Sequence, residues 1–327
     1  MNDIIARFAE AVLAGRHLQR PQVDELLTAS TEALDDLLYW SGKIRRRFFG
    51  NAVRLCSIVP GRLGGCSQDC AFCAQSARYN TAIDKTPRLL SEDQVMAAAV
   101  EAKKNGVPRF GIVYSGKAVS EEELSRLETI LAKIVRETGL KVCAALGIID
   151  VEQARRLAAA GVTRYNHNIE TSENHFPKIV TTHTWAQRVA AIRAAQAAGL
   201  DICAGGIFGI GETEADRVDM ALALRALGVD TVPMNFLHPI PGTPLADVAP
   251  LKPLEILRTI ALYRFIMPQT HLKLAGGRVS NLRDLQSWAF QAGATSILTG
   301  DYLTTAGRSA REDIRMLKDA GLSTADN

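Results

Sequence analysis

From residue 51 onward, short apolar runs alternate along the chain with longer stretches in which apolar residues recur every three or four positions. Runs of the first kind are typical of strands, and the periodic stretches are typical of amphipathic helices. The apolar runs are rich in β-branched residues and do not alternate cleanly with polar ones, as expected of parallel strands buried on both faces. The predicted strands cover residues 53–59, 109–115, 141–147, 164–168, 201–209, 231–237, 272–277 and 295–300.

Six of these strands follow a helical stretch that ends in glycine. Examples are Gly139 in RETG and Gly228 in RALG, and a glycine at this place suits the left-handed conformation that ends many helices. Eight strand–helix units in roughly 250 residues predict an α/β fold, the (β/α)8 TIM barrel, whose active sites gather at the carboxyl ends of the strands. A doubly wound open sheet is the alternative that the number of elements leaves open.

Three regions divide the chain. Residues 1–50 carry a helical period and predict an N-terminal helical extension. The barrel is expected to occupy residues 51–310, and residues 311–327 form a C-terminal tail. We expect the last part of this tail, residues 317–327, to fray.

Composition and charge argue against nucleic acid and membranes as partners of this protein. Of the 327 residues, 47% are hydrophobic and 22% charged, and the net charge of +3 comes from basic residues interleaved with acidic ones, so no basic stripe predicts nucleic-acid binding. No apolar run approaches the roughly 20 residues that a membrane span needs. Asp3 and Glu10 lie in the N-terminal helical pattern, which argues against a presequence for export or for an organelle, so we expect a cytoplasmic protein.

Three of the six cysteines form a compact C-x3-C-x2-C motif at Cys66, Cys70 and Cys73, on a glycine-containing loop after the first predicted strand. Six cysteines in a large chain of a reducing compartment favour metal ligation over disulfides. Thiolates at this spacing can hold an iron–sulfur cluster and leave one iron free for a ligand that is not protein. A structural zinc site is the alternative, but it prefers four protein ligands, and no further Cys or His follows nearby. The motif therefore predicts a [4Fe-4S] cluster.

This motif on this loop resembles the radical S-adenosylmethionine superfamily. The resemblance implies that the open iron binds the amino and carboxylate groups of S-adenosylmethionine, and that an added electron cleaves it to methionine and a 5′-deoxyadenosyl radical. Phe72, just before the third cysteine, matches the position that contacts adenine. The stretch GGIFGIGE matches the superfamily pattern G-x-I-x-G-x-x-E at Gly205, Ile207, Gly209 and Glu212, which implies that Ile207 also contacts the cofactor.

A closer resemblance covers about residues 20 to 320. The segments CAFCAQSARYNT, RYNHNIETS, CAGGIFGIGET, VPMNFLHPIPGTPL, GGRVSNL and GDYLTTAG are similar to those of the biotin synthase family. That family inserts sulfur into dethiobiotin at two unactivated carbons, which implies two S-adenosylmethionine molecules per product, a homodimer, and an electron donor such as flavodoxin or ferredoxin. Side-chain bases cannot remove alkane hydrogens, so a cofactor must supply the chemistry.

The same resemblance implies roles for five polar residues. Asn166 and Asn168 of the YNHN segment would bind substrate and cofactor, Glu170 would meet the ribose, where the family usually has Asp, and Arg188 would hold the cofactor's carboxylate. Asn235 would bind the ureido ring of the substrate. Carboxamides offer both donors and acceptors, which suits a cyclic urea.

An asparagine that merely caps a helix or a turn is the alternative for each of these positions. His167 alternates to the opposite face of its strand from both neighbouring asparagines, so we interpret it as structural.

Biotin synthases also carry an auxiliary iron–sulfur cluster, regarded as the sulfur donor and usually held by three cysteines and an arginine. Cys143, Cys203 and Arg278 match three of these ligands, but the expected cysteine of the second strand is replaced by Gly111. The site has then been lost, or it survives with two thiolates, or another cysteine contributes.

Cys56 is the one cysteine left without a role, and it lies on the first strand, which neighbours the second and the eighth in a closed barrel. Its parity in the strand allows it to point inward, and the missing side chain of Gly111 leaves room. We therefore predict an auxiliary cluster held by Cys56, Cys143 and Cys203, of the four-iron type rather than [2Fe-2S], whose remaining iron carries an extra sulfide or meets Arg278. An ordinary buried thiol is the alternative for Cys56.

Two other functions stay open at this point. The related methylornithine synthase and the hydrogenase maturase resembling it keep the first cluster but lack the paired YNHN segment and the auxiliary ligands. A non-catalytic iron–sulfur electron carrier would need neither the asparagines nor a barrel of this size.

Overall fold

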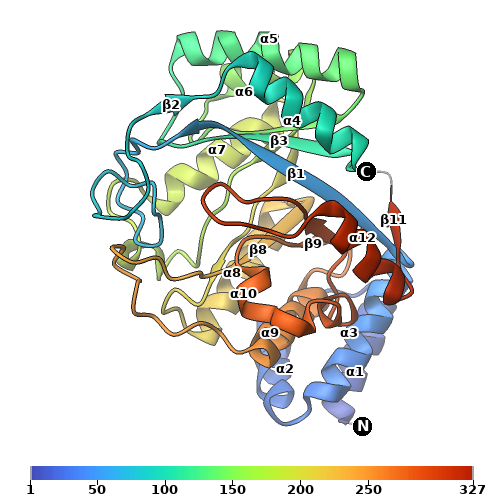
Figure 1. Cartoon of the computed structure of the whole chain (residues 1–327). Coiled ribbons are helices and arrows are strands. Elements are labelled where there is room, and N and C mark those ends of the chain that lie inside the picture. Colours follow the sequence, from blue (N-terminus) through green and yellow to red (C-terminus); the bar gives the residue numbers. More distant parts are fainter. Residues whose placement is uncertain (1, 326–327) are drawn as a thin grey trace.

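Eight parallel strands close into a barrel in the computed structural model, which describes residues 2–325 (Figure 1). The strands follow one another around the barrel in chain order, and the last pairs with the first, so the predicted TIM barrel is confirmed and the open sheet is wrong. The barrel strands are β1 (Ala52–Leu63), β3 (Arg109–Tyr114), β4 (Lys141–Ala145), β5 (Val162–Asn166), β6 (Asp201–Cys203), β8 (Thr231–Phe236), β9 (His271–Leu274) and β10 (Ser296–Leu298).

Helices surround the barrel, and most of them begin at a residue that caps them. Ser120, for example, accepts a hydrogen bond from the backbone amide of Glu123, whose side chain accepts one from the Ser120 amide in return. This reciprocal arrangement satisfies two amides of the first turn that otherwise have no partner. The helices that alternate with the strands are α4 (Glu92–Lys104), α5 (Glu121–Thr138), α6 (Val151–Ala159), α7 (Trp185–Ala197), α8 (Glu214–Leu227) and α9 (Pro253–Ile266).

The N-terminal extension is helical, as predicted. Its helices are α1 (Asp3–Leu13), α2 (Arg20–Glu32) and α3 (Leu34–Phe49), and Figure 1 shows them together at one end of the barrel beside α9. Both α2 and α3 contact α9, and α1 packs on α3. The extension therefore covers the outside of the barrel and leaves the carboxyl ends of the strands free.

The predicted strand at 201–209 is two strands in the structure, Asp201–Cys203 and Gly206–Phe208, separated by residues 204–205. The tail also differs from expectation. Its helix buries Leu317, and its last strand pairs in parallel with Ala52–Arg54 of β1, so the prediction that residues 317–325 fray is wrong; residues 326–327 lie outside the described part. The remaining elements are β2 (Arg88–Leu89), β7 (Gly206–Phe208), β11 (Ser323–Ala325), α10 (Arg278–Leu282), α11 (Trp288–Gln291), α12 (Ala310–Asp319) and the 3-10 turns η1 (Phe176–Lys178) and η2 (Arg283–Leu285).

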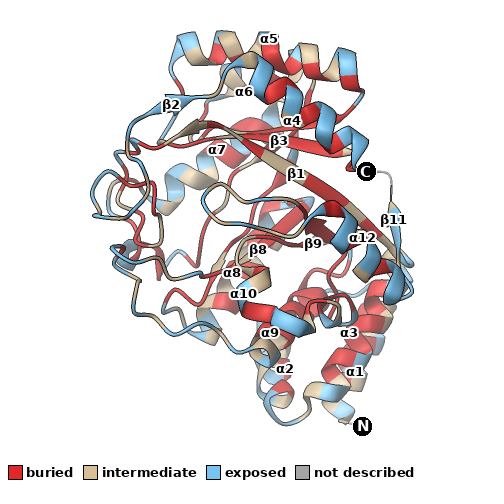
Figure 2. Cartoon of the chain, viewed as in Figure 1, coloured by how far each residue is buried: buried red, intermediate tan, exposed pale blue. Residues whose placement is uncertain are grey.

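The core lies in two layers, one inside the barrel and one between the strands and the helices. Figure 2 shows the barrel strands and the inward sides of the helices buried, with exposed residues on the outer helix faces. Among residues 2–325, no helix has both the length and the apolar character required to cross a membrane.

One buried arginine fixes the end of α9. The guanidinium of Arg264 is fully buried and donates to the carbonyls of Gly293, Met267, Pro268 and Thr270 at 2.9 to 3.0 Å. We expect Arg264→Met to lower the free energy of unfolding by about 3 kcal/mol, because buried carbonyls would lose their donors. Urea denaturation measures the difference.

Arg16→Met is the matched control, since this arginine is exposed, and it should change the free energy of unfolding by less than about 0.5 kcal/mol. Equal losses in the two variants would show that the buried hydrogen bonds of Arg264 contribute nothing specific.

Candidate active site

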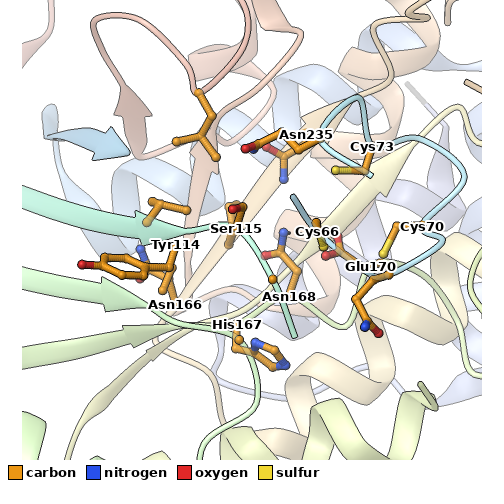
Figure 3. Close-up of a pocket in the computed structure, with 18 of the residues that line it drawn as sticks. Cys66, Cys70, Cys73, Tyr114, Ser115, Asn166, His167, Asn168, Glu170 and Asn235 are labelled. Atoms are coloured by element: carbon orange, nitrogen blue, oxygen red, sulfur yellow. Dashed lines mark hydrogen bonds between the residues drawn. The ribbon is translucent and has the colours of Figure 1, made fainter. Parts of the chain in front are cut away.

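The three-cysteine loop leaves the barrel at the carboxyl end of β1 and folds back on itself. The amide of Cys66 donates to the carbonyl of Gln75 at 3.3 Å, its carbonyl accepts from Ala77 at 2.8 Å, and the amide of Cys73 donates to the carbonyl of Cys70 at 2.9 Å. All three cysteines border one cavity (Figure 3). The structure therefore brings the predicted cluster ligands together.

Burial disfavours free thiolates in this loop. It raises the pKa of Cys70 to about 12 and also raises that of Cys73. Bound iron would stabilise these thiolates, because metal ligation requires the deprotonated sulfur. Within residues 2–325, no group of three or more His, Cys, Asp or Glu side chains is arranged to hold one metal ion; an iron–sulfur cluster instead distributes its ligands over different irons.

The cavity has a volume of about 350 Å³ and runs from the three-cysteine loop into the barrel, where Cys203 and Lys273 border it. Its size falls in the range of small-molecule sites. An adjoining cavity of about 290 Å³ shares Phe72 with it and adds Ile207 and Tyr302. Both expected contacts of the cofactor's adenosyl part, Phe72 and Ile207, therefore lie at this site.

The YNHN segment ends β5 and presents both asparagines to the cavity. The side-chain oxygen of Asn166 is buried without a hydrogen-bond partner. Asn168 is engaged on both sides, since its oxygen accepts from the Gly205 amide at 3.2 Å and its nitrogen donates to Glu170 at 3.3 Å. In Figure 3 the imidazole of His167 points away from both asparagines, although the residue is among those that border the cavity. Asn166 thus offers a free, buried acceptor in the wall of the cavity.

Glu170 forms a buried ion pair with Arg188, with 3.2 Å between the carboxylate and the guanidinium. Burial raises the pKa of Glu170, while Arg188 and Asn168 act in the opposite direction. The backbone of Glu170 is left-handed, with φ of 68°, a conformation that costs about 1–3 kcal/mol outside glycine. A Cβ on Gly206 would lie 2.3 Å from the Glu170 carbonyl oxygen, so this turn requires glycine beside it.

His183 links this ion pair to the cysteine loop, and no feature of the sequence pattern had singled it out. The Nε of Arg188 donates to Nε2 of His183 at 3.0 Å, and Nδ1 of His183 lies 2.9 Å from Oε1 of Gln68. Because arginine can only donate, Nε2 must be the unprotonated nitrogen, and Nδ1 carries the proton that Gln68 accepts. Burial, together with Arg188 and Lys117, lowers the pKa of His183 to about 4.

Asn235 borders the cavity from β8 but is also bound to the backbone on both sides. Its nitrogen donates to the Gly206 carbonyl at 3.1 Å, and its oxygen accepts from the Gly276 amide at 2.9 Å. A carboxamide can make two bonds at each end, so one donor and one acceptor remain for a ligand. Asn235 therefore stabilises the local backbone, as the alternative interpretation expects, and can still hydrogen-bond a ligand.

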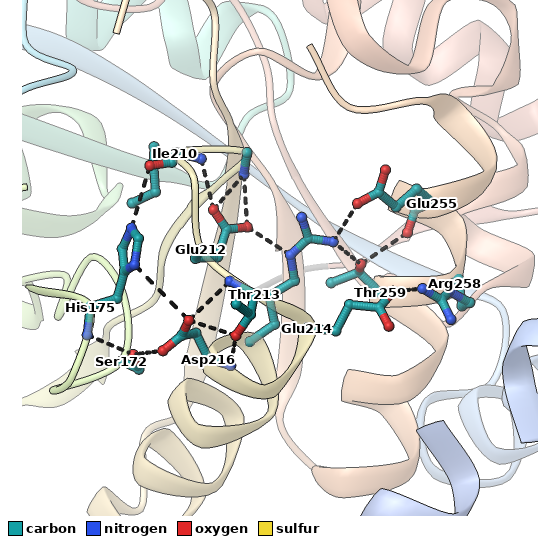
Figure 4. A network of polar contacts seen from close by, with 12 residues as sticks. Ser172, His175, Ile210, Glu212, Thr213, Glu214, Asp216, Glu255, Arg258 and Thr259 are labelled. Carbon is teal, nitrogen blue, oxygen red and sulfur yellow. Dashed lines mark hydrogen bonds and ion pairs between the residues drawn. The ribbon is translucent and has the colours of Figure 1, made fainter. Parts of the chain in front are cut away.

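Glu212 of the glycine-rich pattern stabilises a turn rather than facing the cavity (Figure 4). Its carboxylate accepts from the amides of Gly209 at 2.9 Å and Ile210 at 2.7 Å. Arg217 donates to Glu212 at 2.6 Å and to Glu255 at 2.8 Å. This buried network holds the turn that follows β7 and so positions Ile207.

A second group of thiols lies deeper in the barrel. Cys56, Cys143 and Cys203 are all buried and sit on β1, β4 and β6. Cys56 and Cys143 each precede by two residues a side chain that borders the cavity, Ile58 and Ala145, so they lie on the same inward face one layer lower. The pKa of Cys56 is raised by burial and further by the other two thiols, which indicates that the three are neighbours.

Buried cations face these thiols. Nζ of Lys273 lies 3.2 Å from Sγ of Cys203, and Nη1 of Arg109 lies 3.4 Å from Sγ of Cys143. Neither cation has a carboxylate within ion-pair distance in the described chain. Arg164 is buried as well, and its ion pair is with Asp201 at 3.3 Å.

The pKa of Lys273 also indicates that the three inner thiols lie near one another around it. Burial alone would lower this pKa. The thiols of Cys203, Cys56 and Cys143 instead raise it. Lys273 is, like His183, a site residue that sequence reasoning missed, yet for Lys273 a signal was present. It stands mid-strand in a run predicted to be buried on both faces, where a charge needs a partner.

The structure does not place Arg278 among these contacts. Its fully buried guanidinium pairs with Asp313 at 2.6 Å and donates to Gln286 and to the carbonyl of Leu298. A guanidinium already neutralised by a buried carboxylate is held in place by it. The cations in contact with thiols are Lys273, five residues earlier in the chain, and Arg109.

Position 111 faces inward beside Cys143, as expected. A Cβ on Gly111 would lie 3.7 Å from the Cβ of Cys143, but only 3.2 Å from a methyl group of Ile58. The space left by the missing side chain is thus partly filled by Ile58, two residues above Cys56.

Comparison with known proteins agrees with this geometry. The Radical SAM superfamily profile matches residues 62–224, and the profile of the Biotin and Thiamin Synthesis associated domain matches residues 233–323. A parallel barrel with three cysteines on the loop after its first strand therefore defines a radical S-adenosylmethionine enzyme.

Two curated relatives narrow the class. The chain is 47% identical to the biotin synthase of Heliobacterium modesticaldum over 323 residues, 99% of either protein. It is 44% identical to that of Geotalea uraniireducens over 327 residues, 100% of this chain and 99% of the relative. The crystal structure of methylornithine synthase has a TM-score of 0.84 at 20% identity, covers 97% of both chains and shows the shared fold alone. The chain belongs to the biotin synthase family, whose members are sulfurtransferases.

The neutral state of His183 predicts a pH dependence of stability. Its pKa is about 4 in the folded chain against 6.5 ordinarily, so the unfolded chain binds more protons between these values and stability falls as the pH drops from about 6.5 to about 4. Arg188 and Lys117 oppose protonation and Asp69 favours it. We expect His183→Gln to lose less stability over this range, by about 1 kcal/mol after solvent screening.

Thermal unfolding at a series of pH values tests this, and the slopes rather than the absolute stabilities are compared. The exposed His17 provides a control, since His17→Gln should leave the slope of the wild type unchanged. A variant at His183 with the wild-type slope would contradict the lowered pKa of His183.

Proposed function

We propose that this protein converts dethiobiotin to biotin by inserting sulfur, using S-adenosylmethionine and two iron–sulfur clusters. The observation that carries the proposal is one cavity that runs from the three outer cysteines to Cys203 of the inner set. Cys66, Cys70 and Cys73 border its outer end, and Cys203 and Lys273 border its inner end. A substrate in this cavity would lie between a source of radicals and a source of sulfur.

The outer cysteines would hold the [4Fe-4S] cluster that binds S-adenosylmethionine. When bound, this pair supplies a carbon radical that can break an unactivated C–H bond, which side-chain acids and bases cannot do. Arg188 would receive the cofactor's carboxylate, Glu170 and Asn168 its ribose, and Phe72 its adenine. The adjoining cavity, which contains both Phe72 and Ile207, supports this orientation.

The substrate's ureido ring would be bound by the asparagines. Asn166 has a buried oxygen without a partner, which suits the N–H of a cyclic urea. Asn168 and Asn235 each keep one donor and one acceptor after their contacts with the protein. Apolar walls from Ile58 and Val113 exclude water from the reacting carbons.

The inner cysteines would hold the auxiliary cluster, which supplies the sulfur. Three observations support Cys56, Cys143 and Cys203 as its ligands: they are buried neighbours inside the barrel, Gly111 provides no thiol, and Lys273 and Arg109 contact two of them and have no carboxylate partner within residues 2–325. Three thiolate ligands suit a four-iron cluster with one open iron; a [2Fe-2S] cluster remains the alternative. Lys273 would supply the cation beside this group, while Arg278 is paired with Asp313.

Three further proposals rest on the family resemblance. The protein would act as a homodimer, take electrons from flavodoxin or ferredoxin, and work in the cytoplasm. A reducing compartment suits six cysteines without disulfides.

The first test is anaerobic turnover of the cluster-loaded chain with a reductant, S-adenosylmethionine and dethiobiotin. We expect biotin, with about two molecules of 5′-deoxyadenosine per biotin, because two C–H bonds are broken. Chromatography of the products measures both. An electron carrier would leave S-adenosylmethionine intact, and a sister enzyme would cleave it without stimulation by dethiobiotin.

The second test concerns Cys56. Anaerobic iron and sulfide counting should give about eight irons per wild-type chain, for two four-iron clusters. Cys56→Ala should lose roughly half of them and retain S-adenosylmethionine binding, because the outer cysteines are untouched. Mössbauer spectra identify which cluster is lost.

Ser57→Ala is the matched control, since Ser57 is the next residue on β1, points to the other face and has no hydrogen-bond partner for its hydroxyl. It should keep the full iron content. An unchanged iron count and unchanged biotin formation in Cys56→Ala would reduce Cys56 to a core residue.

A further inference from the structure

Residues 179–183, here called the strap, cross the three-cysteine loop and are bonded to it along their length. The Asp69 carboxylate accepts from the amides of Thr181 and Thr182 at 3.0 and 3.1 Å, and from both of their hydroxyl groups. Burial would raise the pKa of Asp69, but these hydrogen bonds hold it well below its usual range. The ionised Asp69, which lies between the first and second cysteines of the motif, therefore binds the loop to the strap.

Two more contacts complete the attachment. The amide of Ala71 donates to the carbonyl of Ile179 at 2.9 Å, and Gln68 accepts from His183. Three of the residues between Cys66 and Cys73 are therefore bonded to a segment more than a hundred positions away. Contacts of this kind hold a loop in one conformation even without a ligand in it.

The end of the strap reaches the other half of the site. Nε2 of His183 accepts from Nε of Arg188 at 3.0 Å, while the same guanidinium pairs with Glu170 at 3.2 Å and donates to the carbonyl of Asn168 at 2.9 Å. These three acceptors together fix the orientation of the Arg188 guanidinium. His183 is the one that joins it to the cysteine loop.

Only a neutral imidazole can fill this place as observed. It must donate at Nδ1 to Gln68 and accept at Nε2 from Arg188, so a lysine or arginine could make only the first bond. His183 is also packed edge-on against Phe176, with 5.7 Å between the ring centroids, and is buried. The ring is therefore fixed in orientation and in tautomer.

We infer that His183 is a positioning residue that holds Arg188 toward the carboxylate of S-adenosylmethionine and, through the strap, couples cofactor binding to retention of the outer cluster. The inference rests on the proposed function, because it takes Cys66, Cys70 and Cys73 as cluster ligands and Arg188 as the cofactor's partner. Coupling of this kind is reciprocal. A bound cofactor holds Arg188, His183 and the loop together, and a loaded loop holds Arg188 in its binding position.

Two substitutions separate the two bonds of His183. The polar atoms of glutamine reach the place of Nε2, so His183→Gln keeps an acceptor for Arg188 and loses the bond to Gln68. Those of asparagine stop at the place of Nδ1, so His183→Asn keeps the bond to Gln68 and leaves Arg188 without its acceptor. His17→Asn on the exposed surface is the control for both.

The experiment uses the full-length chain loaded with its clusters under anaerobic conditions. Equilibrium dialysis gives the Kd of S-adenosylmethionine, electron paramagnetic resonance of the reduced outer cluster reports the cofactor bound to it, and an iron chelator gives the rate of cluster loss with and without the cofactor. For the wild type we expect a shifted spectrum and slower cluster loss when the cofactor is present.

His183→Asn should weaken cofactor binding about tenfold, as expected for a lost hydrogen bond to a charged group. His183→Gln should bind within about threefold of the wild type, and in it the cofactor should slow cluster loss less than in the wild type, because the bond from His183 to the loop is cut while direct binding to the cluster remains. Asp69→Asn should also reduce this protection, while Asp84→Asn, at an exposed carboxylate of the same loop region, should not.

Wild-type affinity, spectrum and protection in both His183 variants would overturn the inference and leave the proposed function standing. A wild-type chain that binds no S-adenosylmethionine would instead contradict the proposed function itself. If His183 were purely structural, both variants would lose thermal stability, and the two would not differ in their Kd for S-adenosylmethionine or in how far the cofactor slows cluster loss. That result would also overturn the inference.

Discussion

Pairing along β1 is the constraint on which the rest of the structure depends. One edge of this long strand pairs with β3, and the other pairs with β10, with Cys56 opposite Arg109 on one side and opposite Leu298 on the other. Because this pairing closes the barrel, it places the strand's inward face against strands far away in the sequence. The same strand carries the three-cysteine loop at its carboxyl end, so both thiol sets take their position from it.

The outer and inner ends of the site differ in how their buried charges are neutralised. At the outer end, Arg188 and Glu170 compensate one another and keep polar groups ready for a zwitterionic ligand. At the inner end, Lys273 and Arg109 face sulfur and no carboxylate. Buried cations without anionic partners are costly, and thiolates are the anions available to them. Negative charge on these sulfurs would therefore stabilise both cations.

Features set by local sequence could be predicted, and features set by distant contacts could not. The strands, the helix ends and the C-x3-C-x2-C loop follow from neighbouring residues, and the structure agrees with them. Lys273 and Arg278 lie close together in sequence, and only the register of β9 and the position of Asp313 on α12 decide which of them meets a thiol. His183 was missed for the same reason, since its importance comes from Gln68, over a hundred residues away.

The pairing of the last strands, β10 and β11, with β1 has a consequence for the order in which the protein folds. The tail strand β11 pairs with the start of β1, and β10, which closes the barrel, also comes late in the chain. All six cysteines lie before residue 204, yet β9 and β10, which complete the barrel around the inner three, come later in the chain. The inner thiols are therefore enclosed only once β10 has paired with β1.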